Sequence, residues 1–562
     1  MPKHLITSAL PYVNGVKHLG NLVGSMLPAD VHARFLRLQG EEVLYICATD
    51  EHGTPSEVAA EAAGLPVDVF CAQQWAIQKD VGERFGLSWD YFGRSSSPEN
   101  HALTKHFAAQ LEANGYIDER ETQQIYSVSD GRFLPDRYVI GTCPHCGYPR
   151  ARGDQCENCT RLLDPDDLID PRSTISGATD LELRATRHLY LLQSKLADKV
   201  RAWIDTKNDW PTLTRSIAYK WLDEGLEDRS ITRDLSWGVP VDRPGFEHKV
   251  FYVWFDAPIE YLGATNEWAD AAPGRDWRSW WYDTGDNVVY TQFMAKDNVP
   301  FHTVFFPCTL IGSGEPWKLP DFIKAFNWLT YYGGKFSTSD QRGVFMDAAL
   351  EILPADYWRY HLMSNAPESD DSSFTWESLA VSVNNELANS YGNFVNRCLS
   401  FVASRSDGVV PDGDDDAIRA SEFAADVARR VGEYTDVLAR KEYRKALNEL
   451  RGLWSAGNAF WEHNEPWKME KGSLELRTTM RTVVHYVRLL AILSSPIIPF
   501  SSETVLAQYG ETVAGSHWPV DIRTELTRIA AGAPIAPPGV LFRKLEDTEI
   551  EAWKERFGAG ES

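Results

Sequence analysis

The sequence predicts an α/β protein whose parallel, doubly wound sheet is split by an insertion and followed by an all-α helical bundle. Three patterns predict this fold: an apolar strand–helix–strand unit opens the chain, a cysteine-rich stretch interrupts the strand-like sequence, and helical periodicity fills the last third. Because domains usually span about 100–200 residues, the 562 residues predict three or four of them.

The strand–helix–strand unit lies at the N-terminus. Residues 4–10 have the pattern of a short buried strand, a turn follows, and a helical pattern starts at His18. Pro28 either interrupts this pattern or begins a second helical stretch that Gly40 ends. Residues 43–47 are a continuous apolar run, as in a buried parallel strand. Such a unit opens a Rossmann-like, nucleotide-binding sheet.

The insertion begins near Gly115, where turn residues and cysteines replace the strand pattern. Strand-like sequence returns over 249–255 and recurs at 288–290 and 304–306. We therefore expect two halves of one nucleotide-binding domain, with the insertion between them. The predicted boundaries are 1–115 for the first half, 116–228 for the insertion and 229–325 for the second half.

Four of the eight cysteines form two C-x2-C pairs within the insertion. Two such pairs can surround Zn²⁺ tetrahedrally, and four thiolates leave no position open for catalysis. We expect one structural zinc ion; a redox pair or chance spacing is the alternative. The predicted ligands are Cys143, Cys146, Cys156 and Cys159. The other cysteines are scattered, which favours a cytoplasmic enzyme over a secreted, disulfide-linked protein.

Residues 384–562 follow helical spacing, and a linker at 326–383 precedes them. The predicted buried faces carry Val427, Val431, Tyr434 and Leu438 in one helix, and Tyr486, Leu489, Leu490 and Leu493 in another. Residues 556–562 have the composition of a frayed tail. No apolar run approaches the about 20 residues of a membrane span, and no signal-peptide core is visible, so no membrane partner is expected.

The chain is acidic, with 80 Asp and Glu against 56 Lys and Arg and a net charge of −24. Phosphates are bound by basic surface, so this charge excludes a protein that binds nucleic acid broadly. It does not exclude a selective nucleic-acid partner held by a few local contacts.

Two short segments are candidates for phosphate chemistry. Residues 18–21 (HLGN) start a helix just after the first strand, where free backbone N–H groups and an imidazole favour an anion. Residues 333–339 (GGKFSTS) form a glycine-hinged loop with a lysine and three hydroxyls, which could close over a triphosphate. Taken singly, the first could be a structural histidine and the second an ordinary polar loop.

Together, these segments resemble the H-I-G-H and K-M-S-K-S signatures of class I aminoacyl-tRNA synthetases. Longer stretches narrow the resemblance to the methionyl-tRNA synthetase family, and it covers nearly the whole chain. They are residues 9–12 (ALPY), 48–54 (ATDEHGT), 252–258 (YVWFDAP), 295–297 (AKD) and 301–302 (FH). The resemblance implies a catalytic sheet domain, a stem-contact domain at 326–383 that carries the KFSTS loop, and an anticodon-binding bundle at 384–562.

The resemblance also implies a two-step reaction. L-Methionine and ATP, with Mg²⁺, form methionyl-adenylate and pyrophosphate, and methionine then passes to the 3′ end of tRNA(Met) for initiation and elongation of translation. It implies catalytic roles for His18, Asn21, Lys335 and Thr338. The implied ATP-binding residues are His18, Gly20, Asn21, Asp297, Lys335, Ser337 and Thr338.

Two positions depart from the family signatures. Asn21 replaces the second histidine of the first motif, as in a known branch of the family, and it donates hydrogen bonds without a charge. Thr338 replaces the second lysine of the loop, and a hydroxyl cannot supply a cation. Either Lys335 or another basic residue substitutes, or activation is slower; we expect activity to be retained.

The amino-acid pocket should offer an acid for the ammonium group and aromatic walls for the thioether. Asp50 follows the second strand, at the sheet edge where ligands bind, and by resemblance it receives the ammonium. The residues implied to bind methionine are Leu10, Tyr12, Asp50, Trp254, Ala257, Pro258, Tyr261 and His302. Core packing is the alternative for each aromatic residue, and a helix cap is the alternative for Asp50.

Three residues of the helical part match the family's anticodon-reading positions. Asn393 and Arg397 are four residues apart and so share a helix face, and Trp467 beside a helix start could stack on a splayed base. A polar helix face and a core tryptophan are the alternatives. The basic cluster at 440–445 fits tRNA backbone contact and a solvated helix face equally well.

Three other functions remain as rivals. A small-molecule nucleotidylyltransferase would leave the helical bundle unexplained, and a zinc-containing RNA-binding protein would lack the reaction. A synthetase for leucine, valine or isoleucine usually carries a larger insertion, and the cysteine enzyme needs an open zinc site. Since the chain ends soon after the bundle, without the extra dimerisation domain of many relatives, we expect a monomer.

Overall fold

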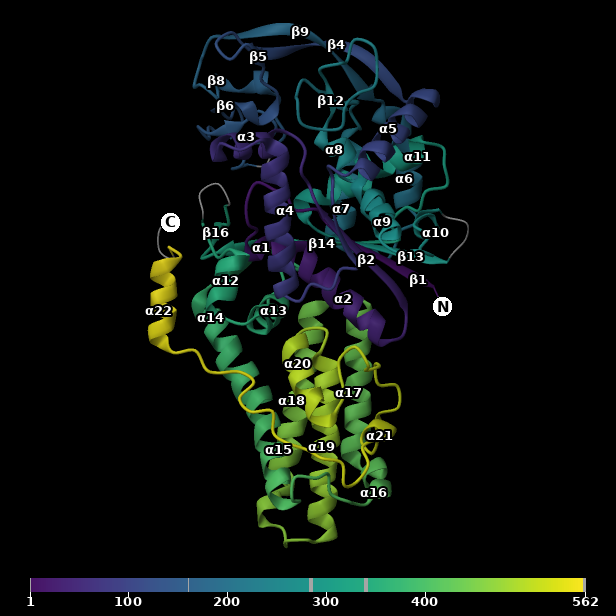
Figure 1. Cartoon of the computed structure of the whole chain (residues 1–562), viewed down its shortest axis with the longest axis vertical. Helices are drawn as coiled ribbons and strands as arrows, with labels where there is room; N and C mark the ends of the chain where they lie inside the picture. Colours follow the sequence, from purple (N-terminus) through teal and green to yellow (C-terminus); the bar gives the residue numbers. More distant parts are fainter. Residues whose placement is uncertain (1, 160, 283–286, 338–341, 559–562) are drawn as a thin grey trace.

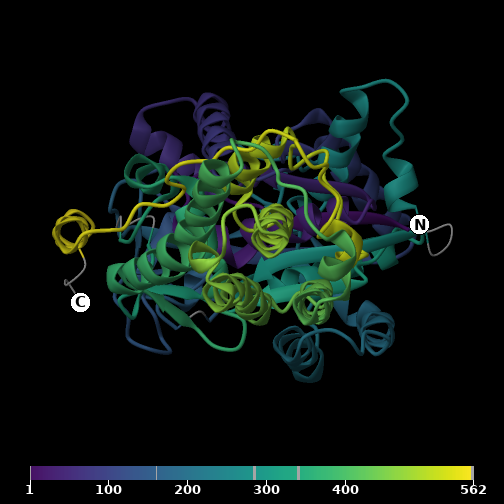
Figure 2. The ribbon, with the colours of Figure 1, turned by 90° about the horizontal axis from the view of Figure 1, so that it is seen from below.

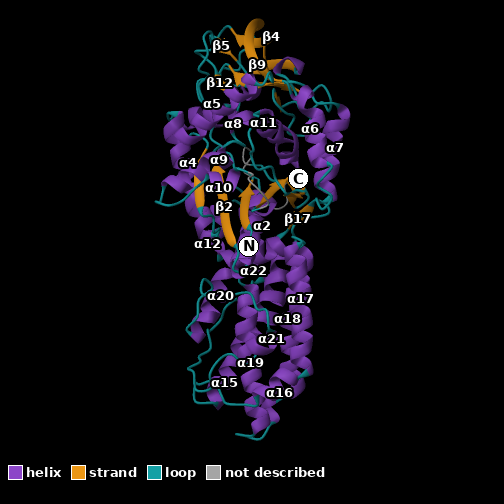
Figure 3. Ribbon diagram, turned by 90° about the vertical axis from the view of Figure 1, so that its right-hand side faces the viewer, coloured by secondary structure: helices purple, strands orange, loops and turns teal. Residues whose placement is uncertain are grey.

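The computed structural model describes residues 2–159, 161–282, 287–337 and 342–558. An α/β part carrying the insertion forms one end of an elongated molecule, and a helical bundle forms the other (Figure 1). The side view shows the strands confined to the upper part and long helices running through the lower one (Figure 3). The predicted fold class is therefore confirmed.

A five-stranded parallel sheet forms the centre of the upper part, in the order β14-β13-β1-β2-β3. Its strands are β1 Lys3–Ser8, β2 Glu42–Thr49, β3 Tyr91–Arg94, β13 Val288–Ala295 and β14 Phe322–Phe326. Leu5 of β1 pairs in register with Leu44 on one side and Tyr290 on the other. The strand order reverses at β1, and ligands bind at the carboxyl edge of such a switch point.

The helix after β1 passes through Pro28 without a break. It comprises α1 Leu19–Asn21, the π-helical turn η1 Leu22–Met26 and α2 Leu27–Leu38. Proline lacks the N–H of a regular helix, and the wider π-turn immediately before α2 places Pro28 in a first turn, where proline is tolerated. Gly40 follows the helix with a φ of +82°.

Two of the predicted strands are wrong. Only β12 Val250–Phe251 is extended within 249–255, because the helix α8 Val253–Asp256 follows. Residues 304–306 lie in the π-helix η6 Phe301–Phe305 and in α11 Phe306–Gly312. These short helices are buried, so they carry the same continuous apolar pattern as a buried strand. The outermost strand on this side is β14, which the apolar runs did not indicate.

The insertion is built on a long antiparallel pair, β4 Ile117–Ser127 and β9 Leu181–Leu191. A smaller three-stranded sheet next to this pair carries the cysteines. Its strands are β6 Val139–Thr142, β7 Ala151–Arg152 and β8 Ile169–Ser173. Tyr138, Leu134 and Ile125 belong to a small core of its own, which also contains Cys143 and Cys156.

The other helices of the upper part cover the sheet and its insertion. They are α3 Thr54–Ala63, α4 Val67–Arg84, α5 Pro98–Ala113, α6 Ala197–Ile204, α7 Thr212–Glu224, α9 Glu260–Asp270 and α10 Arg278–Trp281. The connection to the bundle contains β15 Leu329–Tyr331, β16 Gly334–Lys335, β17 Ser372–Phe374, α12 Met346–Ile352, α13 Ala355–Ser364 and α14 Trp376–Val381.

The bundle contains four long helices, seen end-on from below in Figure 2. They are α15 Asn393–Arg405, α17 Glu422–Ala439, α18 Tyr443–Asn464 and α19 Leu474–Ser494; α16 Asp415–Ala420, α20 Pro499–Leu506, α21 Ile522–Glu525 and α22 Asp547–Arg556 are shorter. The predicted apolar faces of α17 and α19 are buried. In the part of the chain that the structure describes, no helix is both long and apolar enough to cross a membrane.

A buried ion pair joins the bundle to the sheet domain. Arg359 on α13 donates to Asp30 on α2 at 2.6 Å, and to the carbonyl oxygens of Pro496 and Ile497 at 2.9 Å. Both charged side chains are completely buried, and breaking such a pair leaves an uncompensated charge. The hydrophobic core also runs without interruption from the sheet into the bundle, so the two ends are held in one arrangement.

Candidate active site

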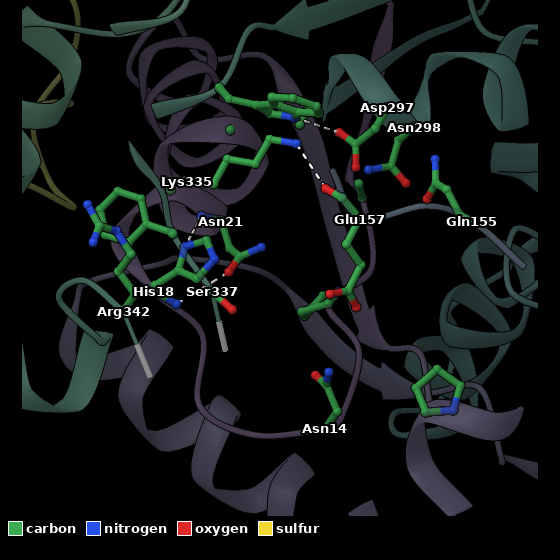
Figure 4. A pocket seen from close by; sticks show the side chains of 18 of the residues that line it. Asn14, His18, Asn21, Gln155, Glu157, Asp297, Asn298, Lys335, Ser337 and Arg342 are labelled. Carbon is green, nitrogen blue, oxygen red and sulfur yellow. Dashed lines mark hydrogen bonds between the residues drawn. The ribbon is translucent and has the colours of Figure 1, made fainter. Parts of the chain in front are cut away.

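A cavity of about 830 Å³ opens at the carboxyl ends of β1 and β13. Its walls come from α1, from the segment after β13, from the cysteine-rich insertion and from the β16 hairpin (Figure 4). The predicted site residues that line it are Leu10, His18, Gly20, Asn21, Asp297, Lys335 and Ser337. The volume lies within the about 300–1,000 Å³ typical of ligand pockets.

His18 and Asn21 cap the start of α1 together. The backbone N–H of Asn21 donates to Nδ1 of His18 at 3.3 Å, and the backbone N–H of His18 donates to Oδ1 of Asn21 at 3.3 Å. Asn21, which replaces the second histidine of the family signature, is therefore hydrogen-bonded to His18. Because Nδ1 accepts, the proton of the neutral imidazole lies on Nε2.

The His18 imidazole is uncharged at neutral pH. Burial, reinforced by the neighbouring Lys17 ammonium, lowers the pKa of His18 to about 3. Phe336 stacks on the ring, with centroids 4.8 Å apart, and a Cβ on Gly20 would lie 3.0 Å from Nδ1 of His18. His18 can thus offer a hydrogen bond to a phosphate oxygen, but no positive charge.

Lys335 extends from the β16 hairpin to the cysteine-rich insertion (Figure 4). Its ammonium donates to the backbone carbonyls of Glu157 at 3.1 Å and Asn158 at 3.4 Å, and it lies 4.7 Å from the ring centroid of Trp328. The Trp328 indole in turn donates to Asp297 at 3.2 Å. Thr338, the other predicted residue of this loop, lies outside the described residues.

The residues predicted to bind methionine lie together behind Leu10. Tyr12 and Asp50 are joined through the backbone, where Val13 donates to the Asp50 carbonyl at 3.1 Å. Nδ1 of His302 donates to the Asn298 carbonyl, and the Tyr261 hydroxyl donates to Nε2 of His302, each at 2.9 Å. Of the eight, only Leu10 lines the large cavity.

The side chains of this cluster pack against one another and against neighbouring aromatic residues. Trp254 packs on Phe301 with ring centroids 4.8 Å apart, beside the turn that holds Ala257 and Pro258. Asp50 is buried, and its Oδ1 has no hydrogen-bond partner among the described residues. Burial, and then the charges of Asp256 and Glu51, raise the pKa of Asp50 well above its usual value. An unpaired buried carboxyl of this kind suits a cationic ligand.

The four cysteines of the insertion converge. Their sulfur atoms lie within 4.8 Å of one another, with Cys143 and Cys159 at 3.9 Å and Cys146 and Cys156 at 3.6 Å. Four thiolates at about 2.3 Å from a tetrahedral zinc are separated by about 3.8 Å. The cluster could therefore hold a metal ion of that type.

The three predicted anticodon residues lie at the far end of the bundle. Asn393 is exposed, and Arg397 pairs with Glu462 at 2.5 Å and with Asn458 at 3.3 Å. Trp467 follows in the turn η8 Pro466–Lys468, and 43% of it is exposed. Helix α18 starts against α2, where the Tyr443 hydroxyl donates to Pro28, and its 22 residues extend about 33 Å.

Sequence reasoning missed several residues around the cavity. Trp328, Arg152, Arg342, Glu157 and Asn158 all line it. Glu157 and Asn158 stand between two of the cysteines, which the sequence shows, but their approach to Lys335 spans more than 170 positions of the chain. Only the folded insertion reveals that contact.

Comparison with known proteins identifies the family. Residues 4–399 match the family described as tRNA synthetases class I (M), and residues 410–562 match the anticodon binding domain of methionyl tRNA ligase. A methionine–tRNA ligase of Caulobacter sp. (strain K31) is 57% identical over the whole of both chains, and that of Streptomyces avermitilis is 58% identical over 99% of each.

A solved structure agrees with these matches. Methionyl-tRNA synthetase of Mycobacterium tuberculosis in complex with methionyl-adenylate superposes with a TM-score of 0.76 at 25% identity, covering 96% of this chain and all of the other. The fold, the cavity at the switch point of the sheet and the two family matches agree, and the chain belongs to the methionyl-tRNA ligase family of class I tRNA synthetases.

Proposed function

We propose that the cavity at the carboxyl edge of the sheet binds ATP and that the cluster behind Leu10 binds methionine. As a member of its family, the chain activates L-methionine with ATP to methionyl-adenylate and pyrophosphate, then transfers methionine to the 3′ end of tRNA(Met). The reciprocal cap of His18 and Asn21, facing Lys335 across one cavity, is the observation that carries the assignment of the ATP site.

Each residue of the ATP site has a chemical role. His18 and Asn21 donate hydrogen bonds to phosphate oxygens, and Gly20 leaves room for the nucleotide beside the helix start. Asp297 accepts hydrogen bonds from the ribose hydroxyls. Its carboxylate is held at the cavity wall by a hydrogen bond from the Trp328 indole. Lys335 and the hydroxyls of Ser337 and Thr338 hold the leaving pyrophosphate, together with a Mg²⁺ ion that accompanies ATP.

Methionine binding completes the reaction geometry. Asp50 receives the ammonium group, which places the substrate carboxylate toward the α-phosphate. Tyr12, Trp254 and Tyr261 surround the side chain, with Leu10, Ala257, Pro258 and His302 closing the pocket. The carboxylate oxygen attacks the α-phosphorus, the bond to the β-phosphate bridging oxygen breaks, and its electron pair leaves with pyrophosphate. Orientation and charge stabilisation supply the catalysis.

The other parts of the chain serve tRNA and stability. Asn393, Arg397 and Trp467 read the anticodon, and the four cysteines hold one structural Zn²⁺ that keeps the insertion folded against the loop. The division into 1–115, 116–228, 229–325, 326–383 and 384–562 assigns these roles to separate domains. A monomer is sufficient for all of them, since one chain carries every site.

Pyrophosphate exchange screened over all twenty amino acids tests this proposal. We expect exchange with L-methionine to exceed that with each of the other nineteen. In a separate competition assay, norleucine should compete with methionine more strongly than leucine does. No exchange with methionine, despite intact folding by circular dichroism, would contradict the proposed active site.

A further inference from the structure

Among the signature positions 18, 21, 335 and 338, Lys335 is the one permanent cation for the charge that ATP brings to the cavity. Its His18 is neutral, with a pKa of about 3, and both Asn21 and Thr338 carry no charge. A triphosphate and its leaving pyrophosphate are strongly anionic, and such transition states depend on fixed positive groups. Some further cation is therefore expected on the cavity wall.

Four cationic residues line the cavity within the described part of the chain: Arg137, Arg152, Lys335 and Arg342. Arg137 is paired with Asp154 at 2.9 Å, and Glu157 lies 4.0 Å away. Lys335 rests on two carbonyl oxygens of the insertion, and Arg342 donates to the Tyr331 carbonyl at 3.3 Å. The acids that face this space are Glu157 and Asp297.

Arg152 differs from the other three. It is half-buried, and its guanidinium makes no ion pair or side-chain hydrogen bond with any described residue. A half-buried guanidinium without an acid is unusual in a chain with a net charge of −24. It is therefore available to an anionic ligand.

The backbone that carries Arg152 is paired within the small sheet of the insertion. The residue pairs with Ile140 across β6 and β7, and the next residue, Gly153, donates to the Val139 carbonyl at 3.1 Å. A Cβ on Gly153 would lie 2.4 Å from the carbonyl oxygen of Asp136, so the backbone next to Arg152 lies against its neighbour with no room for a side chain. The same small sheet carries the cysteine turn whose carbonyls hold Lys335.

We propose that Arg152, on the cysteine-rich insertion, binds the β- and γ-phosphates of ATP and stabilises the leaving pyrophosphate. It would take the place of the second lysine of the family's loop signature, which Thr338 replaces in this chain. A guanidinium suits this role because it presents a planar fork of donors to phosphate oxygens. The insertion thereby contributes a residue to catalysis besides its metal site. This inference rests on the proposed ATP site and extends it to a second domain.

Arg152→Gln, studied in the full-length, metal-loaded protein, tests the proposal. We expect the KM for ATP, and that for pyrophosphate in the reverse reaction, to rise about ten- to hundredfold, as for loss of a charged hydrogen bond. The KM for methionine and the inhibition constant of adenosine should not change, because neither ligand has a phosphate. Arg152→Lys should fall in between.

Arg161→Gln is the matched control, since this exposed arginine of the same insertion bonds His145 and lies outside the cavity lining. It should leave all four constants and the zinc content unchanged. Thr338→Lys combined with Arg152→Gln should recover part of the lost affinity for ATP, because the new ammonium replaces the missing charge.

Three results would overturn the proposal. They are unchanged constants for ATP and pyrophosphate in Arg152→Gln, an equal loss for adenosine and ATP, or a loss confined to Arg342→Gln. His18→Ala separates this failure from failure of the ATP site itself: if it weakens ATP binding while Arg152→Gln does not, the site stands and the role of Arg152 is wrong.

Discussion

The cavity at one end of the molecule and the tip of the bundle at the other are organised in opposite ways. At the cavity, His18 and Asn21 are already held by reciprocal hydrogen bonds at 3.3 Å, and Phe336 stacks on the imidazole. At the far end of the bundle, Trp467 is 43% exposed and Arg397 is occupied by Glu462. A pre-organised site loses little entropy on binding, whereas the proposed contact of Arg397 with RNA would require its ion pair with Glu462 to open.

This difference suits the two tasks. Transition-state stabilisation requires groups that do not rearrange during the reaction. Recognition of one anticodon, as proposed for Arg397 and Trp467, instead requires that other RNA be rejected. Any RNA that contacts Arg397 has to open its ion pair with Glu462, which adds a barrier against unselective binding.

His18→Ala should have the largest effect. It removes a donor at the phosphates and half of the cap of α1, so we expect pyrophosphate exchange to fall by about 10²–10³-fold. Aminoacylation should fall by the same factor, because the first step precedes the second. Exchange within about threefold of the unaltered protein would show that the pre-organised pair is not catalytic.

Trp467→Ala, at the tip of the bundle, should lower aminoacylation of tRNA(Met) without changing pyrophosphate exchange. Base–aromatic stacking contributes about 1–3 kcal/mol, so aminoacylation of tRNA(Met) should drop about 5- to 150-fold. Pyrophosphate exchange without tRNA should be unchanged. Comparing the two assays on one preparation checks this, and Leu474→Ala, another exposed apolar residue near this end, serves as control; equal loss in both assays would remove Trp467 from anticodon reading.

Methionine binding should weaken as the pH falls. The ammonium of the substrate needs an ionised Asp50, and burial with the nearby Asp256 and Glu51 raises the pKa of this carboxyl, while Lys17 lowers it. Protonation of Asp50 therefore begins at a higher pH than for an ordinary aspartate. On acidification, the KM for methionine should begin to rise at a higher pH than the KM for ATP does, and Asp50→Asn should abolish that difference.

Glu462→Gln should have the smallest effect. It frees Arg397 from an exposed ion pair worth about 0.2–1 kcal/mol, so tRNA(Met) should bind up to about fivefold more tightly. Binding of tRNAs with other anticodons should rise at least as much, because the barrier against them is lost. Filter binding of both tRNA classes measures this; an unchanged ratio with weaker binding throughout would contradict it.

Much of the fold could be predicted because strong local patterns carried it. Periodicity and spacing along short stretches predict the first and second strands, the helical faces of Val427 and Leu489, and the cysteine cluster. The strands predicted over 249–255 and 304–306 failed because a short buried helix and a buried strand expose the same apolar residues to the same surroundings. A buried side chain such as Trp254 or Phe301 fits a helix and a strand equally well, and the packing of neighbouring elements decides between them.

The candidate site also has features that short stretches of sequence predict and features that depend on how the domains pack. Residue types and spacing along the chain were enough to predict the HLGN and GGKFSTS segments and the four cysteines as candidates. The roles proposed for Asp50, Asn393, Arg397 and Trp467 came from the family resemblance. Three contacts became visible in the folded chain: Lys335 rests on the carbonyls of Glu157 and Asn158, Arg397 is paired with Glu462, and Arg152 lines the cavity. These contacts join segments far apart in the chain, and their geometry depends on the packing of whole domains, which local patterns do not contain.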